Sequence, residues 1–141
     1  MSWNIAPARL VLEEAGKLMQ TIRTLLIVQV ALFAFAALTH FGMIGSSHRH
    51  PPAGTAESVI GTVLLIGLLS TWMTPSSIRS IAIAVQAFGL LGTLVGIATI
   101  IVGIGPRSML DIVFHTSMTV ALVTGLIVTS KASLQAKDYF R

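Results

Sequence analysis

Charged residues are confined to the ends of four long apolar stretches of the chain. No Asp, Glu, Lys or Arg occurs within residues 24–48, 58–78, 80–106 or 112–130. An α-helix rises about 1.5 Å per residue, so about 20 residues cross the roughly 30 Å hydrocarbon core of a bilayer. Backbone N–H and C=O groups in lipid must pair within their own segment, which favours helices. The runs are also too long for barrel strands and do not alternate. The pattern therefore predicts four transmembrane helices.

The segments between these stretches are short and rich in turn-forming residues. The predicted helices cover residues 22–44, 56–74, 79–104 and 109–130. The three connections contain Gly, Ser and Pro, which break helices and form turns. Short connections make consecutive helices antiparallel neighbours. The predicted fold class is therefore all-α: a polytopic, up-down-up-down four-helix bundle that occupies residues 1–141 as one domain.

The N-terminal segment 1–21 is more polar than the four spans. Its residues 5–21 combine apolar positions with Glu13 and Glu14, which suits a short interfacial helix lying on the cytoplasmic surface of the membrane. The alternative is a helical extension of the first span.

Composition supports a membrane environment and excludes several chemistries. Hydrophobic residues make up 54% of the chain and charged residues 10%, against about 25% charged in soluble domains. The net charge of +4 does not indicate nucleic acid as a partner, because the basic residues lie at span ends and not in one patch. The absence of cysteine excludes thiol nucleophiles, Cys-ligated zinc or iron–sulfur sites, and disulfides. The predicted partner is the lipid bilayer.

Basic residues are distributed unequally between the two membrane faces. The face that holds both termini carries Arg9, Lys17, Arg23, Arg79, Lys131, Lys137 and Arg141. The opposite face carries Arg49 and Arg107. Cytoplasmic loops are enriched in Lys and Arg. We therefore expect a protein of the bacterial cytoplasmic (inner) membrane with both termini in the cytoplasm.

Two sets of residues are predicted to hold the helices together. Gly89, Gly92, Gly96 and Gly103 share one face of the third helix. Small residues allow close helix contact in lipid, so this face is expected to seat the first or fourth helix of the same chain, or alternatively a second copy in a homo-oligomer. Gln29 and Gln86 lie at similar depth, about a third of the way in from the cytoplasmic side, which predicts an interhelical hydrogen bond.

All four histidines are expected at the non-cytoplasmic end, and two of them lie inside spans. His40 lies near the end of the first helix, and His115 lies two turns into the fourth. Both are roughly 6–10 Å inside the membrane boundary, so the two rings can face each other. Ionisable residues within a membrane often mark a functional site, and paired histidines on facing helices suit a b-type haem. The alternative is that each ring makes hydrogen bonds alone.

Asp111 has two predicted roles. It lies four residues before His115, so its carboxylate can accept the Nδ1–H of that histidine and orient the ring. It also completes an S-x-x-D capping box with Ser108 at the start of the fourth helix. The two roles are compatible.

A transition metal is the second candidate cofactor. The predicted ligands of Zn, Ni or Cu are His40, His48, His50, Glu57 and His115. Alternatively, His48 and His50 are solvated loop residues, and Glu57 stabilises the start of the second helix behind an N-cap at Thr55. Arg107 is expected to pair with Asp111 or Glu57, or to contact lipid phosphate.

The segment from Gly89 to Gly125 and the His40/Glu57 region carry a family resemblance. The most distinctive part is a G-x-G-P-R turn at 103–107 followed by D-x-x-x-H at 111–115. In these features the chain resembles small four-span bacterial membrane proteins of unassigned function. The resemblance implies a four-span fold and brings no activity, cofactor or site residue with it.

The functional prediction is an accessory or cofactor-binding membrane module with a His/acidic site at its non-cytoplasmic face. A metal-handling membrane protein and a purely structural subunit of a larger membrane complex are the alternatives. An enzyme is disfavoured, because the sequence has no nucleophile–base–orienter set, phosphate loop or paired-carboxylate site.

Overall fold

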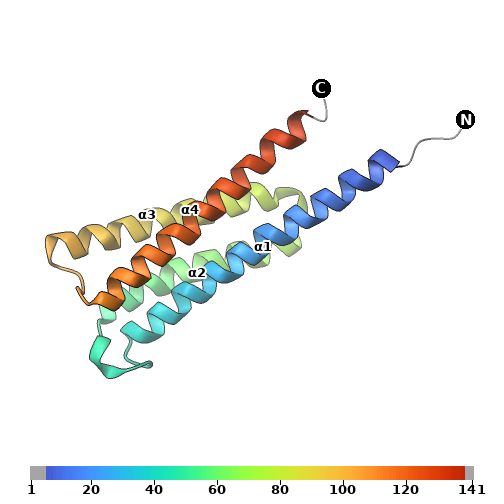
Figure 1. The fold of residues 1–141 in the computed structure, drawn as a ribbon. Helices are drawn as coiled ribbons and strands as arrows, with labels where there is room; N and C mark the ends of the chain where they lie inside the picture. Colours follow the sequence, from blue (N-terminus) through green and yellow to red (C-terminus); the bar gives the residue numbers. More distant parts are fainter. Residues whose placement is uncertain (1–5, 139–141) are drawn as a thin grey trace, which may run out of the picture.

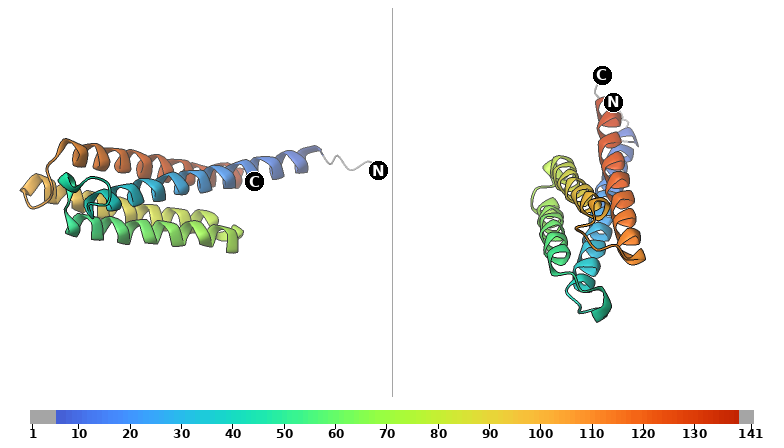
Figure 2. Two further views of the ribbon diagram at one scale, coloured as in Figure 1. Left: turned by 90° about the horizontal axis from the view of Figure 1, so that it is seen from below. Right: turned by 90° about the vertical axis from the view of Figure 1, so that its left-hand side faces the viewer.

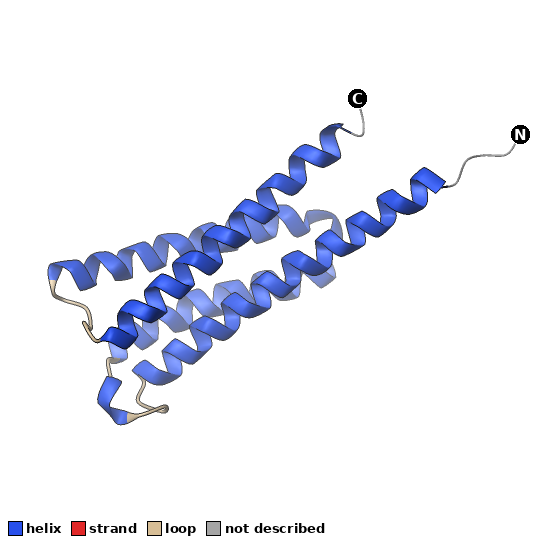
Figure 3. Cartoon of the chain, in the orientation of Figure 1, coloured by secondary structure: helices blue, strands red, loops and turns tan. Residues whose placement is uncertain are grey.

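The chain forms four long helices joined by short connections. A computed structural model describes residues 6–138, and the side chains of residues 9, 10, 13–45 and 47–131 within them. The helices are α1 (Ala6–His40), α2 (Pro51–Met73), α3 (Ile78–Val102) and α4 (Met109–Asp138). Short 3-10 helices, η1 (Ser46–His48) and η2 (Pro75–Ser77), lie in the first two connections. The all-α bundle predicted from the sequence is confirmed (Figures 1 and 3).

The helices run alternately up and down. Each packs against two neighbours: α1 contacts α2 and α4, and α3 contacts the same two helices, whereas α1 and α3 lie across the bundle from each other. The α1–α2 and α3–α4 connections lie at one end, which we call the His40 end (Figure 1). The α2–α3 turn lies at the opposite end, the terminal end, where α1 and α4 project past it (Figure 2).

All four helices contain a stretch that is long and apolar enough to cross a membrane. Many large hydrophobic side chains on their outer faces are exposed in the isolated chain, including Leu91 and Val95 on α3 and Val120 on α4. Such a surface is stable against lipid and not against water. The protein is therefore a multi-pass membrane protein.

Residues 6–21 do not form a separate interfacial helix. They continue α1 without a break, which corresponds to the alternative of a helical extension. Residues 9–21 contain one glycine, Gly16, and no proline, and most of the others are good helix formers. Lys17 also pairs with Glu13 at 2.9 Å, one turn away, which supports the continuous helix.

The three glycines within α3 that were predicted to form a packing face contact other helices of the same chain. A methyl group added at Gly92 would meet Ile60 of α2 at 2.6 Å, and one at Gly96 would meet His115 of α4 at 2.6 Å. Gly89 likewise lies against Leu122 of α4 and Ile60. The neighbours are thus α2 and α4, whereas the sequence suggested the first or fourth helix.

Gly103 has a different role from the other three. It ends α3 in the left-handed conformation, with φ +85°, which glycine adopts without strain. Arg107 closes the same helix end by donating to the carbonyls of Ile100 at 2.9 Å and Ile101 at 3.0 Å. The expected pairing of Arg107 with Asp111 or Glu57 is therefore not found, because its guanidinium satisfies the last carbonyls of α3.

The predicted hydrogen bond between the two buried glutamines is confirmed. Gln29 Nε2 donates to Gln86 Oε1 and to the carbonyl of Ala121, both at 2.9 Å. Gln86 Nε2 donates to the Ala82 carbonyl at 2.9 Å and to Thr129 Oγ1 at 3.3 Å. These bonds join α1, α3 and α4 in the interior, where an amide without any partner would be costly. Among the described residues, Gln29 Oε1 is the one amide oxygen of the pair that is buried without a hydrogen-bond partner.

Candidate functional site

His40 is the centre of a buried polar cluster that joins three helices. Its Nδ1 lies 2.7 Å from Glu57 Oε2 of α2, and its Nε2 lies 2.7 Å from Asp111 Oδ1 of α4. The exposed fraction of the side chain is 0% for His40, 7% for Glu57 and 3% for Asp111. We call Glu57, His40 and Asp111 the acid–histidine cluster.

The two short contacts set the smallest number of protons that the acid–histidine cluster holds. Carboxylate oxygens and an unprotonated ring nitrogen are all acceptors, so each N···O contact requires one proton. An imidazolium supplies both protons. A neutral imidazole supplies one, and a carboxylic acid supplies the other. In either arrangement, with Glu57 Oε1 unprotonated, the cluster carries a net charge of −1.

Asp111 combines the two kinds of role that the sequence suggested, with one change of partner. Its Oδ2 accepts from the Ser108 backbone N–H at 2.7 Å and from the Ser108 hydroxyl at 2.6 Å, so the capping box is present. Its Oδ1 is directed to His40, whereas the i, i+4 spacing predicted His115 as the partner. His115 is held by the backbone carbonyl of Asp111 instead, at 2.8 Å from Nδ1.

A small cavity of about 210 Å³ adjoins the acid–histidine cluster at the His40 end. Its walls are mainly apolar and include Phe33, Ile60 and Met118, with Gly92 and Gly96 of α3 also among the lining residues. Val95 and Ile104, which are 64% and 76% exposed, lie at its rim. We call this cavity the outer pocket.

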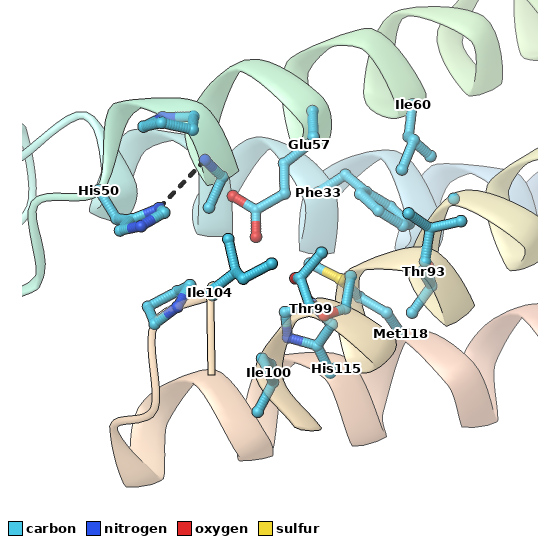
Figure 4. A pocket seen from close by; sticks show the side chains of 18 residues that line it. Phe33, His50, Glu57, Ile60, Thr93, Thr99, Ile100, Ile104, His115 and Met118 are labelled. Atoms are coloured by element: carbon cyan, nitrogen blue, oxygen red, sulfur yellow. Dashed lines mark hydrogen bonds between the residues drawn. The ribbon is translucent and has the colours of Figure 1, made fainter. Parts of the chain in front are cut away.

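Glu57 connects the acid–histidine cluster to the outer pocket. Its Oε2 contacts His40, but its Oε1 is buried without a hydrogen-bond partner. Figure 4 shows the carboxyl group of Glu57 directed into the pocket from α2, with His115 and Thr99 on the opposite wall. A buried, unpaired carboxylate oxygen is costly, and such groups commonly indicate a function or a bound partner.

The remaining histidines separate into two positions. His50 caps the start of α2, where its Nδ1 accepts from the Ala53 N–H at 3.3 Å, and it lines the outer pocket. His48 lies in η1 and is not among the residues that line the pocket. The expected N-cap at Thr55 is wrong, because Pro51 and Pro52 form the first turn and Thr55 lies inside α2.

The predicted haem and metal ligation stays a prediction. Both ring nitrogens of His40 already contact carboxylates, so ligation by His40 would require one of these contacts to break. Among the described residues, no group of three or more His, Asp or Glu side chains is arranged to hold a metal ion.

Comparison with known proteins identified no similar protein. No protein-family model, no curated protein and no solved structure matches the chain.

Proposed function

We propose that this protein is a small binding module of the bacterial inner membrane, which takes a ligand into the outer pocket from the non-cytoplasmic side or from the bilayer. The observation that carries the proposal is Glu57 Oε1, a buried carboxylate oxygen without a partner, directed into a cavity. His40 contacts the other oxygen of this carboxyl group, and Asp111 contacts His40 in turn, which holds the Glu57 side chain in place. The arrangement suits binding better than catalysis, because the hydroxyl groups of Thr93 and Thr99 in the pocket donate to carbonyls of their own helix and not to a general base.

The other predicted functions are less well supported by the geometry. A haem between His40 and His115, or a metal bound by these histidines with Glu57, would require one of the two 2.7 Å contacts of His40 to break. A structural subunit would account for the helix contacts but gives no reason for an unpaired buried oxygen beside a cavity. Homo-oligomers and larger complexes remain compatible with binding.

The accessibility of the outer pocket tests the proposal. The chain has no cysteine, so a single introduced thiol is unique. Thr99 lines the pocket, and its hydroxyl donates to a carbonyl of its own helix; Thr39 does the same at 2% exposure but is not a lining residue. We expect neutral methyl methanethiosulfonate to modify Thr99→Cys at least about tenfold faster than Thr39→Cys, as measured by mass spectrometry in lipid nanodiscs.

Two results would count against binding in the outer pocket. Equal rates at the two positions would mean that reagent enters through general opening of the bundle. An unreactive Thr99→Cys would mean that the cavity is closed to small molecules.

The orientation is tested separately with two exposed serines. Ser47 lies in the α1–α2 connection at the His40 end, and Ser76 lies in the α2–α3 turn at the terminal end. The excess of basic residues at the terminal end predicts that this end is cytoplasmic. On intact cells, a membrane-impermeant maleimide is expected to label Ser47→Cys and to label Ser76→Cys only after lysis. The reverse result would place the site in the cytoplasm.

A further inference from the structure

The polar groups of the outer pocket are almost all hydrogen-bond acceptors. The hydroxyl groups of Thr93 and Thr99 donate their hydrogens to the carbonyls of Gly89 at 2.8 Å and Gly96 at 2.7 Å. Each hydroxyl oxygen is then left as an acceptor. Glu57 Oε1 adds an acceptor that has no partner.

His115 is an acceptor towards the pocket as well. Its Nδ1 lies 2.8 Å from the Asp111 carbonyl, which can only accept, so this nitrogen carries the hydrogen. In the neutral ring Nε2 is left with a lone pair. The exception is His50 near the start of α2, whose Nδ1 accepts from Ala53 and whose other nitrogen can donate.

The charge beside the outer pocket and the size of the pocket restrict the class of ligand further. With its two hydrogen bonds formed and Glu57 Oε1 unprotonated, the acid–histidine cluster behind the pocket carries a net charge of −1. Its side chains are buried, so this charge is weakly screened. The pocket walls are mainly apolar. The volume of about 210 Å³ is below the roughly 300–1,000 Å³ of pockets that take drug-sized ligands.

We propose that the outer pocket binds a small ammonium ion with an apolar body, or the ammonium end of a longer amphiphile, with the N–H groups on Glu57 Oε1 and the facing acceptors. This inference rests on the proposed function and names its ligand class. An ammonium group supplies donors and no acceptor, which complements this lining, and its charge offsets that of the acid–histidine cluster. A carboxylate ligand would face acceptors and like charge, whereas an alcohol would supply one donor and no charge.

Three probes of equal chain length separate these alternatives. An alkylammonium is charged at neutral pH, as the ε-amino group of lysine is, with a pKa of about 10. For the full-length protein in nanodiscs of zwitterionic phosphatidylcholine, we expect n-hexylammonium to bind at least about tenfold more tightly than hexan-1-ol, and hexanoate to bind more weakly than either. Shifts of the unfolding temperature with probe concentration give the three affinities.

A matched pair of variants assigns this preference to the site. Glu57→Gln removes the carboxylate in the pocket, and Glu14→Gln removes one on the solvent-exposed part of α1. We expect the ratio of ammonium to alcohol affinity to fall to near one in the first variant and to be unchanged in the second. Equal affinities for the three probes, a preference for hexanoate, or a ratio unaffected by Glu57→Gln would overturn the proposal.

A second measurement does not depend on the folding of Glu57→Gln. In the Thr99→Cys variant, the thiolate displaces methanesulfinate from a methanethiosulfonate and forms a mixed disulfide. We expect the cationic aminoethyl reagent to react at least about tenfold faster than the anionic sulfonatoethyl reagent, after normalisation to the exposed Ser76→Cys. A ratio near one, with rapid reaction of the neutral methyl reagent, would reject the ammonium ligand and leave the binding pocket intact. No reaction with any reagent would reject both.

Discussion

Replacing His40 with alanine is expected to lower the free energy of unfolding by about 3–5 kcal/mol, the usual cost of removing one partner from a buried charged cluster. The substitution removes both 2.7 Å contacts and leaves the carboxyl groups of Glu57 and Asp111 facing each other in a buried space. Neither acid then has a donor from the ring, and two negative charges buried near each other repel. The defect therefore arises mainly from the acids and not from the lost volume of the imidazole.

The dependence on pH distinguishes this origin from simple loss of packing. In the alanine variant, folding at neutral pH leaves the two acids buried without a counter-charge or forces them to take up protons. The free-energy deficit should therefore shrink as the pH falls and the acids become protonated in the unfolded chain as well. A packing defect would change little with pH. Dodecyl sulfate titrations of the protein in mixed micelles, followed by circular dichroism at several pH values, measure the difference.

Two further variants complete the test of His40. His48→Ala is the same substitution in the outer connection and should change the stability by less than about 0.5 kcal/mol. Adding Glu57→Gln to His40→Ala should restore part of the stability, because one of the two buried acids is removed. A loss below about 1 kcal/mol for His40→Ala, or simple additivity in the double variant, would show that the acid–histidine cluster does not bind the three helices together.

The fold was predictable because the features that determine it can be read directly along the sequence. Charge-free runs define the spans, and the Gly/Pro-rich connections make consecutive spans antiparallel. Depth in the membrane also follows from distance along a helix to its end. For this reason Gln29 and Gln86 could be paired from the sequence, and the structure joins them at 2.9 Å.

The partners of His40 were not predictable in the same way. The depths of His40, Asp111 and His115 were close to one another, but which of them touch depends on the rotation of each helix about its axis. Hydrophobic patterning fixes that rotation weakly when a helix is apolar on all sides, as these are. In the structure Asp111 faces His40, and His115 lies one turn further along α4 against Gly96.

The position of Glu57 was misjudged for a local reason. Taking Thr55 as the N-cap placed Glu57 in the first turn, where an acid stabilises the helix dipole. The helix begins at Pro51, so Glu57 lies well inside α2 and is 5% exposed. The His50-Pro51-Pro52 sequence was the available signal, since proline is favoured in the first turn of a helix and a side-chain acceptor is favoured just before it.

Replacing Gly125 with alanine is the second large effect, at about 2–4 kcal/mol of lost stability. Gly125 faces the buried glutamine pair, and a methyl group there would overlap Gln86 Oε1 and lie 2.5 Å from Gln29 Nε2. Both amides are buried, so they cannot move towards solvent, and the 2.9 Å hydrogen bond between them must break or α4 must move away. The same dodecyl sulfate titration measures the loss.

Gly16→Ala provides the matched control, because a methyl group at that helical position meets nothing within 4 Å. Alanine there should be neutral or stabilise α1 by up to about 1 kcal/mol through its higher helix propensity. Combining Gly125→Ala with Gln86→Ala removes the side chain that the methyl group overlaps, so the double variant should lose less than the sum of the two single losses. Additive losses, or a neutral Gly125→Ala, would mean that α4 accommodates the methyl group by shifting. The glutamine pair would then not set the distance between α1, α3 and α4, and close packing at Gly89, Gly92 and Gly96 would have to set it instead.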